Sequence, residues 1–168
     1  MDVYETIRTI LAVRSFQEKP VPEEVIRRIV EAGRLTGSSM NRQPWHFVVV
    51  TQHETLGRIG ALASSGPYIA QSAFAIVVLV EHSSPYGLSD ASRAIQSMML
   101  AAWAEGVGSN WVGFYGLDAL RPLLGYPDAL DVVAVIPFGY PVQSSGLGKK
   151  KRKPLNEVAH RERFGSSL

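Results

Sequence analysis

Apolar and polar positions along this chain follow two periods, one typical of helices and one typical of buried strands. Apolar residues three and four positions apart predict helices, and short unbroken apolar runs predict strands buried on both faces. Helices are expected at about residues 2–11, 22–36, 54–62, 89–105, 117–124 and 154–160. Strands are expected at residues 45–51, 73–80 and 131–139. Since helices and strands alternate without a repeat or a linker, residues 1–168 are predicted to form one layered α/β-type domain.

Local signals predict where the helices begin and end. Asp2 is expected to be an N-cap, and Ser89 or Asp90 is expected to cap the long helix. Pro22 suits a first helical turn, where its missing N–H costs no hydrogen bond. Gly37 is the predicted stop of that second helix.

The composition is that of an ordinary globular domain. Of the 168 residues, 46% are hydrophobic and 19% are charged. The longest apolar run, residues 73–80, is much shorter than the ~20 residues of a membrane-spanning helix, and the N-terminus lacks the pattern of a signal peptide. Cysteine is absent, which excludes disulfides and thiol catalysis. A cytoplasmic protein with no membrane partner is expected.

A basic run, Lys149–Lys153, departs from this ordinary composition. Without it the chain carries more acidic than basic side chains, so the run is a local anion-attracting segment. A solvated loop or a nucleic-acid tract is the commoner meaning of such a run. A phosphate site is the alternative, since arginine and lysine both bind phosphate. Charge alone slightly favours the commoner meaning, although the run lacks the aromatic residues of a nucleic-acid binder.

A polar loop, Gly37–Gln43, ends at Pro44 and leads directly into the apolar run at residues 45–51. Short polar side chains in such a loop bond either to the backbone or to a polar ligand. Those side chains are Ser38, Ser39, Asn41 and Gln43.

Three glycines, Gly106, Gly108 and Gly113, do not match a dinucleotide-binding fingerprint, because their spacing is wrong and they follow a helix. A tight turn accounts for the first two, whereas Gly113 within an apolar strand indicates close approach of a ligand to the backbone. Gln96 lies on a mostly apolar helix face and needs partners there. The histidines lack metal-site spacing, and no Gly-x-Ser-x-Gly motif is present, so neither metal nor hydrolase chemistry is predicted.

Taken together and in order, three segments resemble the FMN-dependent nitroreductase family. Residues 5–16 with Pro20-Val21 resemble the family's opening helix and Arg-Arg-Ser-x-Arg segment. Residues 38–45 resemble its Pro-Ser-x-x-Asn-x-Gln-Pro-Trp segment, and residues 150–160 resemble its basic-Pro-Leu-x-Glu-Val-x-His element. The resemblance covers nearly the whole chain.

The resemblance implies roles for particular residues. Arg14 matches an arginine that faces the N1 and O2 edge of the flavin, where a cation stabilises reduced flavin. Lys150 and Arg152 match the pair that holds the FMN phosphate. The loop residues match a segment that reaches the flavin of the partner subunit. The segment whose backbone lies near flavin N5 and O4 corresponds to Trp111, Val112 and Gly113.

Two departures from the family pattern are present. The paired arginines fall on Ile10 and Leu11 and the serine on Ala12, so Lys149–Arg152 are left with more of the phosphate to bind. Gly37 replaces the proline that usually opens the second segment.

The implied fold is α+β, with three α/β/α layers around a mixed, mainly antiparallel sheet, in an intertwined homodimer with flavin at the interface. The implied function is an FMN-dependent oxidoreductase that takes hydride from NAD(P)H and reduces nitroaromatic, quinone or similar acceptors in two stages. No catalytic side chain is required, because the flavin carries the hydride. A flavin- or deazaflavin-binding protein with little turnover is the alternative, and a nucleic-acid binder is the third reading.

Overall fold

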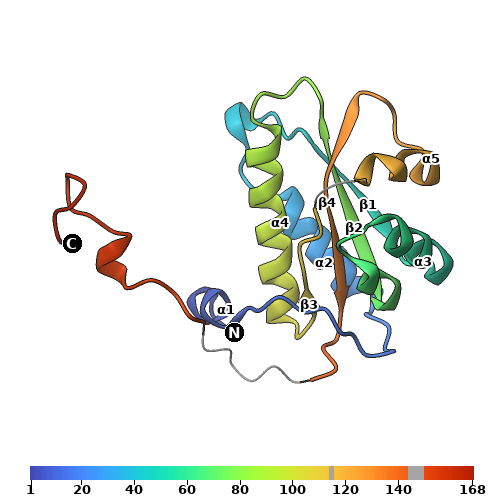
Figure 1. Ribbon diagram of the computed structural model, residues 1–168, viewed down its shortest axis with the longest axis horizontal. Helices are drawn as coiled ribbons and strands as arrows, with labels where there is room; N and C mark the ends of the chain where they lie inside the picture. The colour runs from blue at the N-terminus through green and yellow to red at the C-terminus, as the bar shows by residue number, and fades with distance from the viewer. Residues whose placement is uncertain (114–115, 144–149) are drawn as a thin grey trace.

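The computed structural model describes residues 1–113, 116–143 and 150–168, and its centre is a sheet of four antiparallel strands (Figure 1). Their spatial order is β1-β2-β4-β3. The bounds are Trp45–Val50 for β1, Phe74–Glu81 for β2, Gly108–Ser109 for β3 and Leu130–Gly139 for β4. The described residues add one parallel bridge, between Ala12 and Ser109, beside β3.

Strand β2 is buried on both faces, as its unbroken apolar sequence predicts. Its even-numbered side chains, such as Ile76 and Val78, belong to one hydrophobic cluster, and its odd-numbered side chains, such as Val77 and Leu79, belong to another. Strand periodicity sends successive side chains to opposite faces of the sheet. Each face of β2 therefore requires its own layer of helices.

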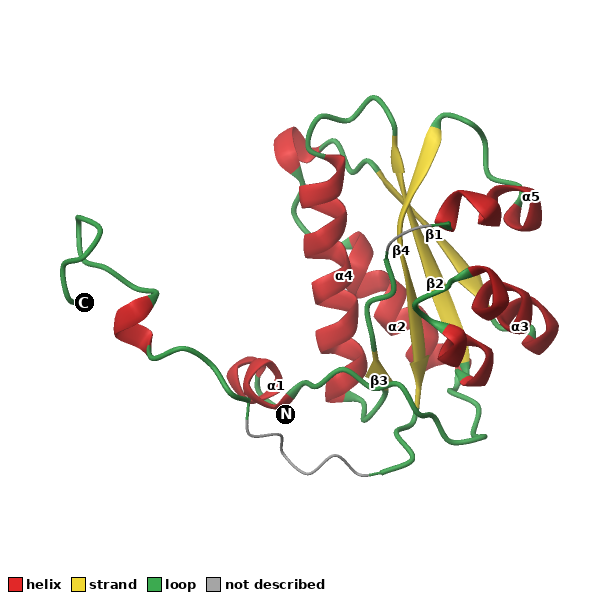
Figure 2. Cartoon of the chain, in the orientation of Figure 1, coloured by secondary structure: helices red, strands yellow, loops and turns green. Residues whose placement is uncertain are grey.

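Two layers of helices supply that cover (Figure 2). Helices α2 (Glu23–Arg34) and α4 (Gly87–Ala104) pack on the first face. Helix α3 (His53–Leu62), the 3-10 turns Pro67–Gln71 and Leu117–Leu120, and helix α5 (Arg121–Leu124) cover the second. A Cβ on Gly33 would lie 2.9 Å from Met98, so glycine lets α2 approach α4 closely. The α+β, three-layer prediction is confirmed, with parallel pairing confined to the Ala12 bridge among the described residues.

Several boundaries differ from the sequence-based expectation. The stop at Gly37 is wrong: α2 ends at Arg34, with Leu35 in right-handed geometry. The cap at Ser89 or Asp90 is also wrong, because α4 begins earlier, at Gly87, with Tyr86 before it. The predicted helix at residues 154–160 is only the 3-10 turn Leu155–Glu157.

A tight turn is expected around Gly106 and Gly108, and the structure confirms it for Gly106, whereas Gly108 lies in the short strand β3. Gly106 has a φ of +77° and ends α4, as a left-handed glycine does. Gly108 instead belongs to β3, where a Cβ would lie 2.5 Å from Val13. Gly139, its partner in the sheet, would place a Cβ 2.9 Å from Phe16. The paired glycines therefore allow the segment at residues 12–16 to cross the sheet edge in close contact.

Helix α1 (Val3–Thr9) makes a hydrogen bond to α4, and several of its apolar side chains are exposed. The Asp2 carboxylate accepts a hydrogen bond from the Glu5 N–H at 2.8 Å, which confirms the predicted cap. Trp103 of α4 donates from Nε1 to Thr9 Oγ1 at 2.9 Å. Thr9 is fully buried, whereas Val3 is 74% exposed. The apolar stripe of α1 therefore does not face this chain's own core.

The last residues form an extended tail that leaves the body of the protein beside α1 (Figure 1). Its apolar side chains lie in solvent in the single chain: Leu155, Val158, Phe164 and Leu168. In the part of the chain that the structure describes, no helix combines the length and the apolar character needed to cross a membrane.

The Thr9–Trp103 contact generates a stability prediction. Thr9→Val keeps the side-chain shape but leaves the Trp103 N–H without its acceptor, so the free energy of unfolding should fall by about 1–3 kcal/mol. Thr6→Val is the matched control, because Thr6 is a buried threonine of the same helix that bonds only to the Asp2 carbonyl. Urea unfolding measures both variants, and equal losses would show that the contact with Trp103 is not what holds α1.

Candidate functional site

A cavity of about 840 Å³ opens between α1, the middle of α4 and the start of the tail. Its size falls in the range of cofactor sites, roughly 300–1,000 Å³. Four of the residues expected to bind the flavin line it: Gln96, Trp111, Lys150 and Arg152. The remaining lining residues are Tyr4, Ile7, Arg8, Ile10, Leu11, Ala12, Met99 and Asn110.

One part of the cavity lining is apolar, with the buried amide of Asn110 beside it. Gln96 also lines the cavity, but its side chain is exposed and does not need the partners expected on an apolar helix face. Ile10, Leu11 and Met99 supply aliphatic surface, and Trp111 supplies an aromatic ring. Asn110 is almost fully buried, and its Nδ2 donates to Tyr68 Oη and, at 3.3 Å, to the Trp111 carbonyl. With both N–H donors engaged, the Asn110 carbonyl oxygen is left as an acceptor for a cavity ligand.

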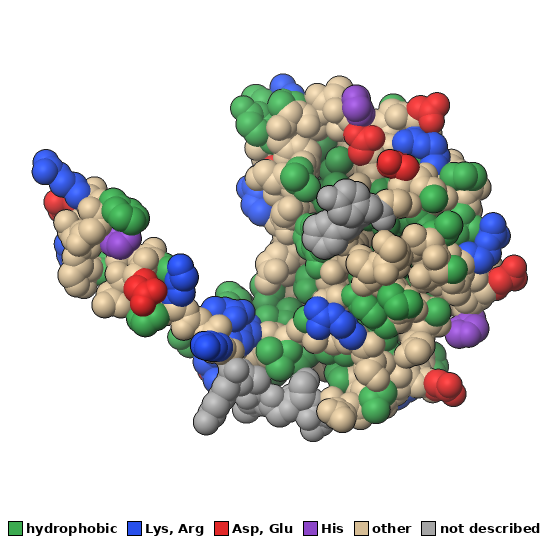
Figure 3. All heavy atoms as spheres, in the orientation of Figure 1, with side chains coloured by type: hydrophobic (Ala, Val, Ile, Leu, Met, Phe, Trp, Pro, Cys, Tyr) green, Lys and Arg blue, Asp and Glu red, His purple; other side chains and the backbone are tan. Residues whose placement is uncertain are grey.

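The opposite wall carries positive charge. Lys150 donates to the carbonyl of Ile7, in the last turn of α1, and Arg152 donates from Nη1 to the Lys151 carbonyl at 3.0 Å. Burial lowers the pKa of Lys150, and the neighbouring Arg152 lowers that pKa further. Both effects disfavour the ammonium form, so a bound anion would stabilise it. Figure 3 shows Lys and Arg side chains gathered where the tail meets α1.

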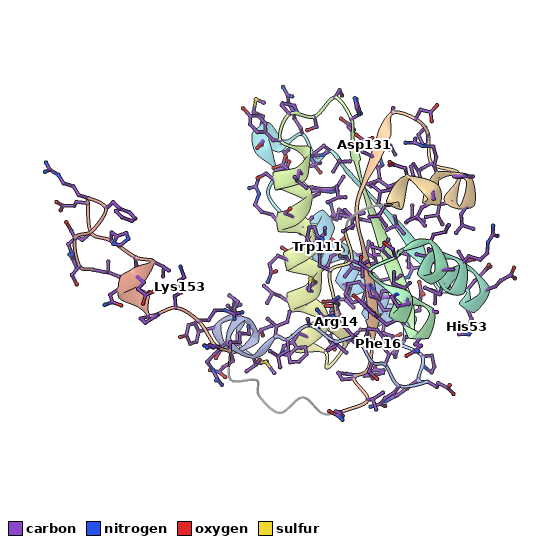
Figure 4. The ribbon with its side chains drawn as sticks, viewed as in Figure 1. Arg14, Phe16, His53, Trp111, Asp131 and Lys153 are labelled. Carbon is purple, nitrogen blue, oxygen red and sulfur yellow. The ribbon has the colours of Figure 1, made fainter. Side chains whose placement is uncertain are left out.

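Arg14 lies beside this cavity rather than in its lining. It lines a smaller cavity of about 300 Å³ with Ser15 and Pro141, and Ala12 forms part of both cavities. The segment that carries Arg14 is held by the Val13 N–H, which donates to the Ser109 carbonyl at 2.9 Å. Figure 4 shows Arg14 on the segment that runs from α1 toward Phe16, whereas Lys153 lies out on the tail.

Val112 and Gly113 belong to the segment that follows Trp111. Val112 is buried in the second cluster and pairs with Val135 through two backbone hydrogen bonds. The apolar strand predicted around Gly113 is therefore a single bridge. A Cβ on Gly113 would lie 2.5 Å from the Trp111 indole nitrogen, so the indole already occupies that side of the glycine.

The polar loop lies at the other end of α4 and does not line the cavity of its own chain. Left-handed φ angles occur at Met40, Asn41 and Gln43, a costly conformation for residues other than glycine. The Ser38 hydroxyl accepts from the Gln43 N–H at 2.9 Å, and the Gln43 amide donates to the side-chain oxygen of Asn41 at 3.2 Å. The loop is thus held by its own polar side chains.

Asp90 anchors the loop to α4. Its carboxylate is 1% exposed and accepts from the Ser39 N–H at 3.1 Å, from the Ser39 hydroxyl at 3.3 Å and from Arg93. The sequence pattern suggests only a capping role for Asp90. In the structure its carboxylate instead binds Ser39 in the loop that contains the left-handed residues.

Two lining residues with strong polar chemistry, Arg8 and Asn110, were missed in the sequence. Arg8 belongs to a helix whose pattern predicted only packing, and Asn110 sits between a glycine turn and an apolar segment. The signal for Asn110 was its position next to Trp111. Lys149, expected to share the phosphate, lies outside the described residues.

The hydrogen bonds from Ser39 of the loop to Asp90 lead to a prediction. Asp90→Ala should lower the free energy of unfolding by about 2–3 kcal/mol, since it leaves the Ser39 donors and Arg93 without an acceptor. Asp131→Ala serves as the control, because the Asp131 side chain is about half exposed and that of its partner His82 is largely exposed, and such pairs contribute at most about 1 kcal/mol. Denaturant unfolding gives both values. Comparable losses in the two variants would contradict the anchoring role.

Comparison with known proteins adds independent information. The sequence model of the Nitroreductase family matches residues 8–78 and 64–140. A protein of Methanothermobacter thermautotrophicus, provisionally named NADH dehydrogenase/NAD(P)H nitroreductase, is 34% identical over 87% of this chain and 81% of its own length.

Solved structures agree with the sequence comparison. A structure of the same provisional name from Parabacteroides distasonis superposes with a TM-score of 0.88 at 30% identity, over 96% of this chain and 98% of that one. A nitroreductase of Desulfovibrio desulfuricans, solved in complex with FMN, gives a TM-score of 0.84 at 29% identity over 98% of both chains. On the family match and these relatives, the chain belongs to the nitroreductase family.

Proposed function

We propose that this protein is an FMN-dependent oxidoreductase that accepts hydride from NAD(P)H and passes it to nitroaromatic, quinone or similar acceptors. The observation that carries the proposal is that one cavity combines apolar and aromatic side chains, two amides and three cations. The names of related proteins support a nicotinamide donor, and the FMN complex of one relative supports the flavin.

The residues of the cavity fit FMN in chemical character. An isoalloxazine ring needs apolar faces, which Leu11, Met99 and Trp111 offer, and hydrogen-bond partners along its polar edges, which Gln96 and Asn110 offer. The phosphate needs cations, and Lys150 and Arg152 lie at the same cavity. Arg14, behind Ala12, is proposed to face the pyrimidine edge of the ring.

When bound, FMN supplies the centre that accepts and releases hydride. The protein's own residues would bind FMN and orient it. Trp111 and Met99 keep water from one side of the cavity, and Asn110, held by Tyr68, presents an acceptor in a defined direction. The positive charge of Arg14, close to the cavity, would stabilise negative charge that develops there during reduction. No side chain is needed as an acid or a base.

We further propose that the active form is a homodimer. The apolar residues of α1 and of the tail, including Val3 at 74% and Phe164 at 93% exposure, would be costly to leave in water. A second copy of the chain would cover them. The polar loop with Ser38, Ser39, Asn41 and Gln43 does not reach the cavity of its own chain, so it is available to complete the flavin site of the partner.

Chromophore and redox experiments test the function. The purified protein should carry FMN, and anaerobic NADH or NADPH should bleach the visible absorption of the flavin, which a quinone or a nitroaromatic compound should then restore. Because the nicotinamide and the acceptor are proposed to use the same cavity in turn, flavin reduction and flavin reoxidation should be separable in stopped-flow measurements. A colourless protein that does not bind added FMN would refute the proposal. Flavin that no nicotinamide bleaches would favour a flavin- or deazaflavin-binding protein with little turnover.

Removal of the tail tests the dimer. A chain that ends at Pro154 should be monomeric by light scattering and should lose FMN on gel filtration. It lacks the exposed apolar residues of the tail, which are proposed to pack against the second subunit. A full-length variant with Arg161→Ala and Arg163→Ala keeps those apolar residues and should remain dimeric. A dimeric truncated chain would show that the tail does not hold the subunits together.

A further inference from the structure

The cationic wall of the cavity contains an arginine that the family resemblance does not account for. Arg8 lines the cavity with Lys150 and Arg152, and no acidic side chain is among the described lining residues. Ile10 and Leu11, which follow Arg8 in the chain and also line the cavity, carry no charge. The anion-binding capacity of this end of α1 therefore rests on Arg8.

The guanidinium of Arg8 is held in one orientation by Glu5, one helical turn earlier. Nε donates to the Glu5 carboxylate at 3.0 Å and Nη2 donates to it at 2.7 Å. This bidentate contact raises the pKa of Arg8 and lowers the pKa of Glu5. Glu5 itself does not line the cavity, so it orients Arg8 without contacting a ligand in the cavity.

The contact with Glu5 leaves the other edge of the guanidinium available. A guanidinium has five N–H donors, and two of them face Glu5. Nη1 has no hydrogen-bond partner among the described residues. The remaining donors on Nη1 and Nη2 form the paired edge that binds two oxygens of one phosphate.

The neighbouring cations, Lys150 and Arg152, are also held by hydrogen bonds, in their case to backbone carbonyls. Lys150 is held by the Ile7 carbonyl and Arg152 by the Lys151 carbonyl, and each keeps further N–H donors. The Ile7 contact also ties Lys150 to the helix that carries Arg8. Three anchored cations next to an apolar wall create a site for a dianion attached to a flat, apolar group.

We propose that Arg8, oriented by Glu5, is a phosphate-binding residue that completes an anion site with Lys150 and Arg152. In the flavin complex its ligand is the terminal phosphate of FMN, and to that extent the inference rests on the proposed function. Because the site binds the phosphate and not the ring, it distinguishes FMN from riboflavin.

Paired titrations of the purified full-length apoprotein test this inference. Arg8→Ala should weaken FMN binding about 10- to 100-fold, as expected for loss of a charge-assisted bidentate contact, while the affinity for riboflavin changes less than about twofold. Arg8→Lys keeps the charge without the paired edge and should give an intermediate loss for FMN alone. Lys150→Ala combined with Arg152→Ala should show the same selectivity. Equal weakening of FMN and riboflavin, or unchanged FMN binding, would overturn the assignment.

The chain offers a matched control in Arg34. Arg34 makes the same contact to Glu31, three residues earlier on α2, with N–O distances of 2.7 and 2.6 Å, and it is similarly exposed. It does not line the cavity. Arg34→Ala should therefore match the small stability change of Arg8→Ala and leave both flavin affinities unchanged. Weakened FMN binding in Arg34→Ala would attribute the effect of Arg8 to general helix stability.

A phosphate-only measurement separates this inference from the proposed function. Inorganic phosphate should raise the thermal midpoint of the wild-type protein and have a smaller effect on Arg8→Ala, since a ligand that binds the folded state stabilises it. If the protein binds no flavin but shows this difference, the flavin proposal fails and the anion site stands. If phosphate stabilises both proteins equally, the anion site fails whatever the flavin result.

Discussion

The burial of β2 on both faces is the constraint on which the rest of the structure depends. An apolar strand with side chains on two sides needs a helical layer on each side, and α4 is fixed in the first layer by Ile95, Met98 and Ala102. The same helix then presents Gln96 and Met99 toward α1, one position beyond the buried ones. One wall of the cavity is thus a consequence of core packing.

Another part of the cavity lining, Ile10 and Leu11, depends on a close approach at the sheet edge. Gly108 and Gly139 face each other across β3 and β4, and their missing side chains leave room for Val13 and Phe16. The segment between α1 and the sheet therefore runs along the edge, where Ile10 and Leu11 reach the cavity. The Thr9–Trp103 hydrogen bond fixes α1 at the end of this segment.

Three polar groups of the site are each held in place by another residue of the chain. Tyr68 holds Asn110, Glu5 holds Arg8, and the Ile7 carbonyl holds Lys150. Groups anchored in this way lose little conformational freedom on binding, so more of their interaction energy contributes to affinity. The Asp90 anchor applies the same principle to the polar loop, whose left-handed residues would otherwise be costly.

Apolar periodicity in the sequence predicted a layered domain with a buried central strand, and local motifs indicated the family and, through it, the α+β fold, because both signals lie in neighbouring residues. The sequence also indicated Gln96, Trp111, Lys150 and Arg152, which the fold brings to one cavity. Only the tertiary structure showed that Gly108 serves a close contact, that Asp90 anchors a loop 51 positions away, and that Arg8 joins the cationic wall. These facts depend on contacts between distant segments, which no local pattern records.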